Sequence, residues 1–538
     1  MRLTDPTTPE VVNDESVCEA CRLKREVAEV VKAINPNHEP DDHPAFDMTT
    51  PPGVDDLRWL GCKEASDVAD SSDNAECFDK IKAWIEDCSQ NHKTSCGPSP
   101  ESSGMVEGPK RLIDTGPLEG NISLRLIDWP GSGGEPIEYC ALSYSWGSDP
   151  TAHFTTTVDT YQQRRNGFEI TQLPQTLRDA VVITRKVGCR FLWIDAVCII
   201  QRDLADWEAE SPRMHHIYGN AFLVIAATEN TSPRDGIFSS RPPPVKFTFE
   251  RAGKSYPITI RPDDHSPWRE KHRVVETQSV PRQPSLHTRA WAYQERLLST
   301  RIVHYTATEL VWECNTCCRC ECSIVEQVCP GNEYDAGKSL KSQFSGNIGT
   351  NKTWQSVILN YSVKKLTVGT DKLPALAGLA KRFASPEMGK YLAGIWHSQL
   401  PDALTWFSFG QNKPDTYRAP SWSWASVDGE IHGIGRSEFQ EGVDCVEVLE
   451  AECTPASSEP FGAVSDGYII LKGLLAQLGS GLADSSGGES WALKMKSYGW
   501  SMILKKSTRV VGAWERLDAE HVNEDIFLGK EPSVVKIV

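Results

Sequence analysis

The sequence lacks the features of several large protein classes. No stretch approaches the roughly 18 uninterrupted apolar residues of a membrane-spanning helix. The first residues contain neither a basic segment nor an apolar one, so we expect no secretion signal. Positive charge is scarce, because 56 Lys and Arg stand against 73 Asp and Glu and give a net charge of −17. This balance disfavours binding to nucleic acid or to an anionic membrane, since both call for a basic surface.

Nucleotide-binding fingerprints and internal repeats are also missing. Neither a Rossmann glycine pattern nor a P-loop occurs, and no motif recurs at a fixed period. The 538 residues, 39% hydrophobic and 24% charged, have a globular composition. Without a secretion signal, the 17 cysteines are expected as thiols or metal ligands and not as disulfides. The sequence therefore predicts a soluble cytoplasmic protein.

Composition divides the chain into three regions. Residues 1–110 form a Cys-rich N-terminal region, in which residues 77–88 have helical periodicity and residues 97–108 have the Gly, Pro and Ser content of a linker. We predict an α/β domain over residues 111–300, with its core at 139–296 and a β-hairpin at 111–129. Residues 301–538 alternate helical and strand-like patterns and predict a mixed α+β region.

The most regular part of the sequence is 139–228. Strand-like apolar runs occupy Tyr139–Trp146, Phe191–Ile200 and Phe222–Thr228, and helical patterns fill 174–188 and 204–218 between them. Near-continuous apolar strands are typical of sheets that are covered on both faces. The order strand, helix, strand, helix, strand predicts a doubly wound parallel sheet. The Pro-rich stretch at 242–285 is expected to be irregular.

Four segments in this region resemble, in order, the motifs of the HET domain, the heterokaryon-incompatibility domain of filamentous fungi. They are LSYSWG (142–147), LPQTLRDAVVITRKVGCRFLWIDAVCIIQ (173–201), DWEAESPRMHHIYGNAFLVIAA (206–227) and RAWAYQERLLSTRIVHY (289–305). Later segments, such as APSWSWASVDG (419–429), resemble parts of full-length HET proteins, so the likeness covers most of the chain. The resemblance implies a cytoplasmic role in non-self recognition and regulated cell death, with protein partners or self-association.

HET domains in turn resemble TIR domains, which share the doubly wound, flavodoxin-like architecture and in several lineages cleave NAD. This likeness between folds implies a second function, an NAD glycohydrolase with NAD as its substrate.

Ligands of parallel sheets bind at the carboxyl ends of the strands. The candidate ligand-binding residues there are Ser145, Trp146 and Gly147, after the first strand, and Asp195, within the second. Trp146 offers a flat ring for stacking, and Gly147 allows close backbone approach to a phosphate or ribose. The alternative is that Trp146 covers the core, that Gly147 only begins a turn, and that Asp195 caps a helix or pairs with an arginine.

Glu210 is the candidate catalytic residue. Trp207, Glu210 and Met214 share a helical stripe, so the carboxylate is expected to be partly buried beside Trp207, with a raised pKa or a dedicated partner. TIR-type NAD glycohydrolases depend on a glutamate at a comparable position. Alternatively, Ser211 caps a new helix that begins at Pro212, which would release Glu210 to solvent.

Two other residues of the domain are candidate catalytic groups. Glu295 is a candidate acid, for which an ion pair with Arg289 or Arg296 is the simpler account. Cys198 invites a thiol-nucleophile interpretation, but in such an apolar run a cysteine is usually an inert small hydrophobe.

Two groups of cysteines have the spacing of metal ligands. The first group predicts a tetrahedral Zn²⁺ site and consists of Cys18, Cys21, Cys88, His92 and Cys96. The last three stand at i, i+4 and i+8, which places them on one face of a helix. The second group consists of Cys314, Cys317, Cys318, Cys320, Cys322 and Cys329. For both groups the alternative is a set of thiols without metal.

Overall fold

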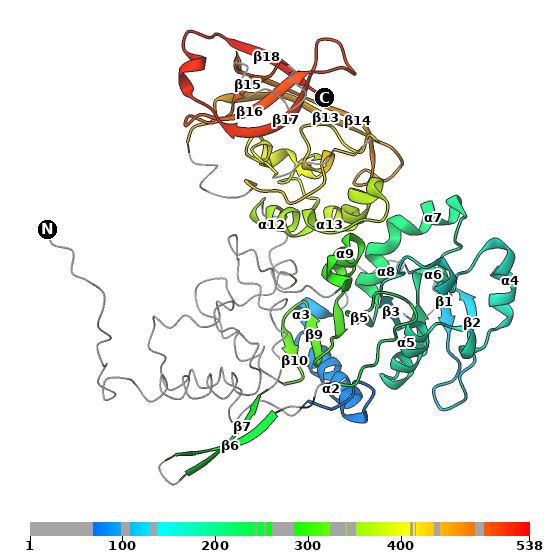
Figure 1. Cartoon of the computed structure of the whole chain (residues 1–538). Helices are drawn as coiled ribbons and strands as arrows, with labels where there is room; N and C mark the ends of the chain where they lie inside the picture. Colours follow the sequence, from blue (N-terminus) through cyan, green and yellow to red (C-terminus); the bar gives the residue numbers. More distant parts are fainter. Residues whose placement is uncertain are drawn as a thin grey trace.

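Two main hydrophobic cores organise the chain, one around a large sheet and one in the C-terminal region (Figure 1). The computed structural model describes residues 68–97, 108–129, 137–241, 243, 245–251, 254–260, 285–322, 341, 351–408, 413–414, 416–434, 442–478 and 489–538. Helix α9 (Ala290–Leu298) joins the two cores, because Ala292 packs into the first while Tyr293 and Leu297 pack into the second.

The large sheet has eight strands within the described residues, in the order β10-β9-β8-β5-β3-β4-β1-β2. They are β1 (Arg111–Asp114), β2 (Arg125–Asp128), β3 (Tyr139–Ser143), β4 (Phe191–Trp193), β5 (Leu223–Ala227), β8 (Arg301–Tyr305), β9 (Leu310–Cys314) and β10 (Cys318–Cys320). The central strands β8, β5, β3 and β4 are parallel, so the three predicted strands are parallel neighbours. The flanking strands are antiparallel, and β1–β2 is the predicted hairpin. The fold is therefore α/β with a mixed sheet.

Local sequence signals explain the elements at the centre of this sheet. Strands β3 and β5 are buried at every residue, as expected of parallel strands covered on both faces. Helix α5 (Gln175–Lys186) begins after Pro174, and the chain leaves it through Gly188 at φ +86°. Its side chains Leu177, Ala180 and Val181 are fully buried and confirm the predicted helical face.

The predicted strand over Phe191–Ile200 is wrong beyond its first residues. Strand β4 ends at Trp193, and Asp195–Cys198 forms the short helix α6. The amide of Cys198 donates to the carbonyl of Ile194 at 2.7 Å, which closes the helical turn. All residues from Leu192 to Ile194 and from Ala196 to Ile199 are buried, so the apolar run has no periodicity that could separate helix from strand.

The helical pattern predicted for 204–218 forms two helices with a 3₁₀ turn between them. They are α7 (Leu204–Glu210) and α8 (Met214–Asn220), joined by Ser211–Arg213. Ser211 has helical dihedrals and caps no new helix, so the interruption does not release Glu210 to solvent. Glu210 is fully buried, whereas Trp207 is 41% exposed. The predicted burial of Glu210 is therefore confirmed, although Trp207 itself is exposed.

The N-terminal helices belong to the core of the large sheet. Helix α2 (Ala75–Asn91), continued by α3 (Lys93–Cys96), packs against β9, and the ring of Trp84 lies 6.1 Å from that of Trp312. The helix predicted at 77–88 is thus confirmed, and its buried face is part of the first core.

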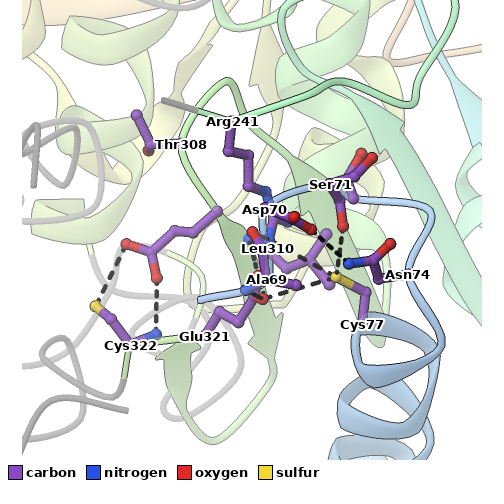
Figure 2. A network of polar contacts seen from close by, with 12 residues as sticks. Ala69, Asp70, Ser71, Asn74, Cys77, Arg241, Thr308, Leu310, Glu321 and Cys322 are labelled. Atoms are coloured by element: carbon purple, nitrogen blue, oxygen red, sulfur yellow. Dashed lines mark hydrogen bonds and ion pairs between the residues drawn. The ribbon is translucent and has the colours of Figure 1, made fainter. Parts of the chain in front are cut away.

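A buried ion pair also holds this N-terminal segment in place (Figure 2). Arg241 Nη1 lies 2.9 Å from Glu321 Oε1, and both side chains are almost entirely excluded from solvent. Glu321 also accepts hydrogen bonds from the amides of Ala69 and Leu310, at 3.1 and 3.0 Å. The residue pair therefore connects three segments that are remote in sequence.

Within its described residues, the C-terminal region combines the α-helices α12 (Asn351–Ser362) and α13 (Pro374–Phe383) with a closed ring of strands. The strands of the region are β11 (Tyr391–Leu392), β12 (Ile395–Trp396), β13 (Val446–Pro455), β14 (Val464–Gln477), β15 (Trp491–Lys494), β16 (Trp500–Lys506), β17 (Trp514–His521) and β18 (Pro532–Ile537). Strands β14 to β18 pair in sequence, and β18 pairs again with β14. Helix α13 packs against α9, between the ring and the large sheet (Figure 1).

One further helix and two further strands belong to the described residues. Helix α4 (Val158–Asn166) packs beside β2. A hairpin of β6 (Val245–Arg251) and β7 (Lys254–Ile260) occupies part of the stretch that we expected to be irregular, so that expectation is wrong there. Among the described helices, none has both the length and the apolar character required to cross a membrane.

Candidate functional site

The first candidate site lies at the carboxyl ends of β3, β4 and β5, where a parallel sheet usually binds ligands. The chain leaves β3 through Ser145 and Trp146, and it leaves β4 through Asp195. Trp146 Nε1 donates to Asp195 Oδ2 at 2.9 Å, and the amide of Ala196 donates to Asp195 Oδ1 at 2.7 Å. Burial raises the pKa of Asp195, and these two hydrogen bonds offset part of the effect.

The backbone beside Trp146 is fixed by close packing. Gly147 has φ +66°, and a Cβ atom there would lie 2.9 Å from the carbonyl oxygen of Thr231. The amide of Ser145 donates to Asn230 Oδ1 at 3.1 Å. His153 Nε2 lies 2.7 Å from the carbonyl oxygen of Trp146. The turn thus requires glycine for its own packing, and this requirement involves no ligand.

Glu295, on α9, is a buried acid next to this edge. Its carboxylate accepts a hydrogen bond from Ser143 Oγ, at the end of β3, and lies near Tyr218 on α8, whose hydroxyl donates to the carbonyl of Leu142 at 3.2 Å. Burial, together with the negative charge of Asp195, raises the pKa of Glu295 to about 7, and the Ser143 hydrogen bond offsets part of their effect. The carboxyl group of Glu295 therefore titrates near neutral pH.

The simple ion pair suggested for Glu295 is not formed. Arg296 binds Glu313 through two hydrogen bonds of 2.7 and 2.9 Å, and Arg289 donates to the carbonyl oxygen of Tyr144. Sequence spacing could not show this, because the nearest arginines in sequence point to other partners. The sequence signal for a buried acid at this position is a glutamate within an amphipathic helix.

We expect Glu295 to make the stability of the protein depend on pH. Its pKa in the folded state, about 7, exceeds the ordinary 4.5, so the folded state binds more protons and stability falls as pH rises between these values. Between about pH 5 and about pH 8 the loss should be about 2–3 kcal/mol relative to Glu295→Gln. Denaturant unfolding of both proteins at the two pH values measures it. Parallel pH profiles would contradict the prediction.

Glu210 lies within a different set of contacts. Both of its carboxylate oxygens accept from the amide of Lys110 at 3.3 Å, and Arg213 Nη1 lies 3.8 Å away. Burial raises its pKa, as predicted, and the Lys110 amide and the nearby Arg111 charge offset part of the rise. The structure thus joins Trp146 with Asp195, but gives Glu210 partners on the segment before β1.

Cys198 has the properties of a core residue. It is fully buried, and burial raises the pKa of its thiol to about 12. Since the thiolate is the nucleophile, such a thiol is unreactive near neutral pH. This agrees with the inert alternative considered for Cys198.

The second candidate site is a cluster of metal-ligand side chains. Cys88, His92, Cys96 and Cys314 each place one ligand atom within 4.8 Å of the others. Three of the five predicted ligands are therefore brought together, while Cys18 and Cys21 lie outside the described residues. The fourth member, Cys314, came from the cysteine group that we treated separately. Its role was missed because Cys88 and Cys314 are 226 positions apart in sequence, and only the fold brings them together.

A smaller group of possible ligands lies nearby. It consists of Glu309, Cys320 and Cys322, all buried. The Sγ atoms of Cys320 and Cys322 are 3.3 Å apart, and Glu309 Oε2 accepts from the amide of Cys322 at 2.9 Å. Both groups have donor atoms that can hold a metal ion.

Comparison with known proteins gives one family. Residues 139–295 match the family model described as Heterokaryon incompatibility protein (HET). The matched range begins at β3, ends at Glu295 in α9, and includes Ser145, Trp146, Asp195 and Glu210. No curated protein and no solved structure gave a significant match.

Proposed function

From the heterokaryon-incompatibility domain that this chain carries over residues 139–295, we propose that the protein is a cytoplasmic signalling or effector module of non-self recognition and regulated cell death. The family match is the observation that carries this function. The parallel strands and the fixed Trp146–Asp195 pair support a TIR-like mode of action, in which the domain associates with itself or with protein partners.

Partly exposed Trp146 is expected to be needed for cell killing, because aromatic side chains at such edges commonly anchor partners. The full chain is expressed under an inducible promoter in fungal strains of different incompatibility types, and viability is counted. We expect Trp146→Ala to restore growth. Trp207→Ala is the matched control, since Trp207 is an exposed tryptophan of the same domain. Growth of every strain that expresses the parent chain would contradict the function. Killing by a folded Trp146→Ala protein would show that the surface around Trp146 is not needed for it.

An NAD glycohydrolase is the alternative function. The observation that favours it is a pair of carboxyl groups with raised pKa, Asp195 and Glu295, beside an aromatic ring at the ligand-binding edge. Cleavage of NAD passes through an oxocarbenium-like ribose, which a positioned carboxylate stabilises. In this alternative, Glu210 remains the proposed catalytic carboxylate, with Ser145, Trp146, Gly147 and Asp195 at the ligand.

Nicotinamide release distinguishes the two functions. Purified protein is incubated with NAD, alone and under crowding that favours assembly. The effector function predicts no release. If nicotinamide is released, Glu210→Gln should lower the rate by about 10²–10³, and Glu295→Gln serves as the comparison variant. A rate that falls only in Glu295→Gln would reassign the catalytic carboxylate.

A further inference from the structure

Helices α2 and α3 present three metal-ligand side chains in one line. The amide of His92 donates to the carbonyl of Cys88 at 3.1 Å, and that of Cys96 donates to the carbonyl of His92 at 2.8 Å. These i to i−4 bonds keep the chain in helical phase across the junction of the two helices. Cys88, His92 and Cys96, at i, i+4 and i+8, therefore share one face.

The end of β9 supplies a fourth ligand at the start of a tight turn. Residues 314–317 read Cys-Asn-Thr-Cys, and the amides of Thr316 and Cys317 both lie 3.4 Å from Cys314 Sγ. Two amides directed at one sulfur stabilise it as a thiolate, which is the form that binds metal. The turn is tied to α3 by a hydrogen bond of 2.8 Å from Asn315 to the carbonyl of Ser95.

The spacing of these atoms fits a tetrahedral ion. With Zn–S bonds of about 2.3 Å, two thiolate ligands of one Zn²⁺ lie about 3.8 Å apart. Cys314 Sγ is 3.4 Å from His92 Nδ1, and all four ligand atoms lie within 4.8 Å of one another. The three cysteines are buried, so the ligand set is closed in the manner of a structural site.

A cation next to the cluster balances its charge. Three thiolates and one Zn²⁺ carry a net charge of −1, and Arg301 Nε lies 3.3 Å from Cys88 Sγ. The same guanidinium donates to the carbonyl of Cys96 at 3.2 Å. Hydrogen bonds from a cation stabilise such an anionic cluster.

We propose that Cys88, His92, Cys96 and Cys314 bind one structural Zn²⁺ ion, which fastens α2–α3 to the edge of the large sheet. The ligands come from both sides of the matched domain, because three precede residue 139 and one follows residue 295. The ion thus joins two segments that flank the matched residues in sequence. The folded unit then extends from α2 to β10 and exceeds the matched residues.

Metal analysis of the purified full chain tests this site. We expect about one equivalent of zinc per chain, and under about 0.2 in Cys88→Ser and in Cys314→Ser. Cys445→Ser, which changes a cysteine of the C-terminal region, should retain the ion, and so should Cys317→Ser. Unchanged zinc in Cys88→Ser and Cys314→Ser would overturn the ligand set, as would zinc loss in Cys317→Ser.

Cobalt and proteolysis give readouts on the unmutated chain, in case the variants do not fold. Replacement of zinc by Co²⁺ should give the strong visible bands of tetrahedral cobalt, with thiolate charge-transfer absorption. Removal of the ion by a chelator should speed proteolytic cleavage at residues 88–97 and leave cleavage in the C-terminal region unchanged. A zinc-free chain with octahedral cobalt would overturn the site, and unaltered cleavage after zinc removal would overturn its fastening role.

Discussion

Replacement of Glu321 by glutamine is expected to lower the free energy of unfolding by about 3–5 kcal/mol. The change leaves the guanidinium of Arg241 buried with no opposing charge, since its side chain is only 2% exposed. It also removes a carboxylate whose two oxygens accept hydrogen bonds from the amides of Ala69 and Leu310 (Figure 2). Glutamine keeps only one of these two acceptor oxygens. Denaturant unfolding at neutral pH measures the loss.

Glu447→Gln is the matched control for this prediction. Glu447 lies 4.0 Å from Lys472 with its side chain 67% exposed, and exposed pairs of this kind contribute about 0–1 kcal/mol. If burial of the charge is the cause, the double replacement Arg241→Met with Glu321→Leu should recover much of the stability lost by Glu321→Gln. Equal losses in Glu321→Gln and Glu447→Gln would show that burial of Arg241 has no such effect.

The sequence predicts those parts of the fold that depend on neighbouring residues. Helix α5 lies between Pro174 and Gly188, and its apolar positions recur every three or four residues, so its bounds and buried face were predictable. Strands β3 and β5 are short apolar runs followed by turn residues, and their parallel pairing follows from the helices between them. The carboxyl ends of such strands share one edge, which is why Trp146 lies beside Asp195.

The remaining features depend on contacts that are distant in sequence. A uniformly apolar run hides the change from β4 to α6, because burial on every side removes the periodicity. The run at 309–314 is strand-like, but local spacing does not show that the end of β9 lies beside α2–α3, and so the meeting of Cys314 with Cys88 was not predicted. Glu210 is a similar case. Its burial was predicted, but its hydrogen-bond donor, the backbone amide of Lys110, lies one hundred residues earlier in sequence.

Asp206, at the start of α7, is the second position where a single replacement should have a large effect. Its carboxylate pairs with buried Arg111, accepts from Lys110 Nζ at 3.1 Å and accepts from the amide of Ile200 at 2.8 Å. Arg111 in turn donates to the carbonyl of Cys198 at 2.7 Å. One carboxylate therefore joins β1, α6 and α7 around the segment that contacts Glu210.

Asp206→Asn is expected to cost about 3–5 kcal/mol at neutral pH, because Arg111 keeps its charge in a buried position and loses the carboxylate that pairs with it directly. Burial by itself would raise the pKa of Asp206, but the hydrogen bonds from Arg111, Ile200 and Lys110 outweigh it and hold the pKa below its ordinary value. A lowered pKa means that this stabilisation is present above the ordinary pKa, about 3.9, and is lost as pH falls through the folded-state value.

The difference in unfolding free energy between the parent and Asp206→Asn should therefore shrink as pH falls below about 4. Denaturant unfolding of the two proteins over a series of pH values measures this difference. Asp128→Asn is the control, because Asp128 also pairs with an arginine, Arg165, but its side chain is 57% exposed. A deficit in Asp206→Asn that stays constant down to low pH would show that it arises from lost shape and hydrogen bonds. A deficit that disappears with acid, and that Asp128→Asn does not share, identifies the buried charge of Asp206 as the group that holds the three elements together.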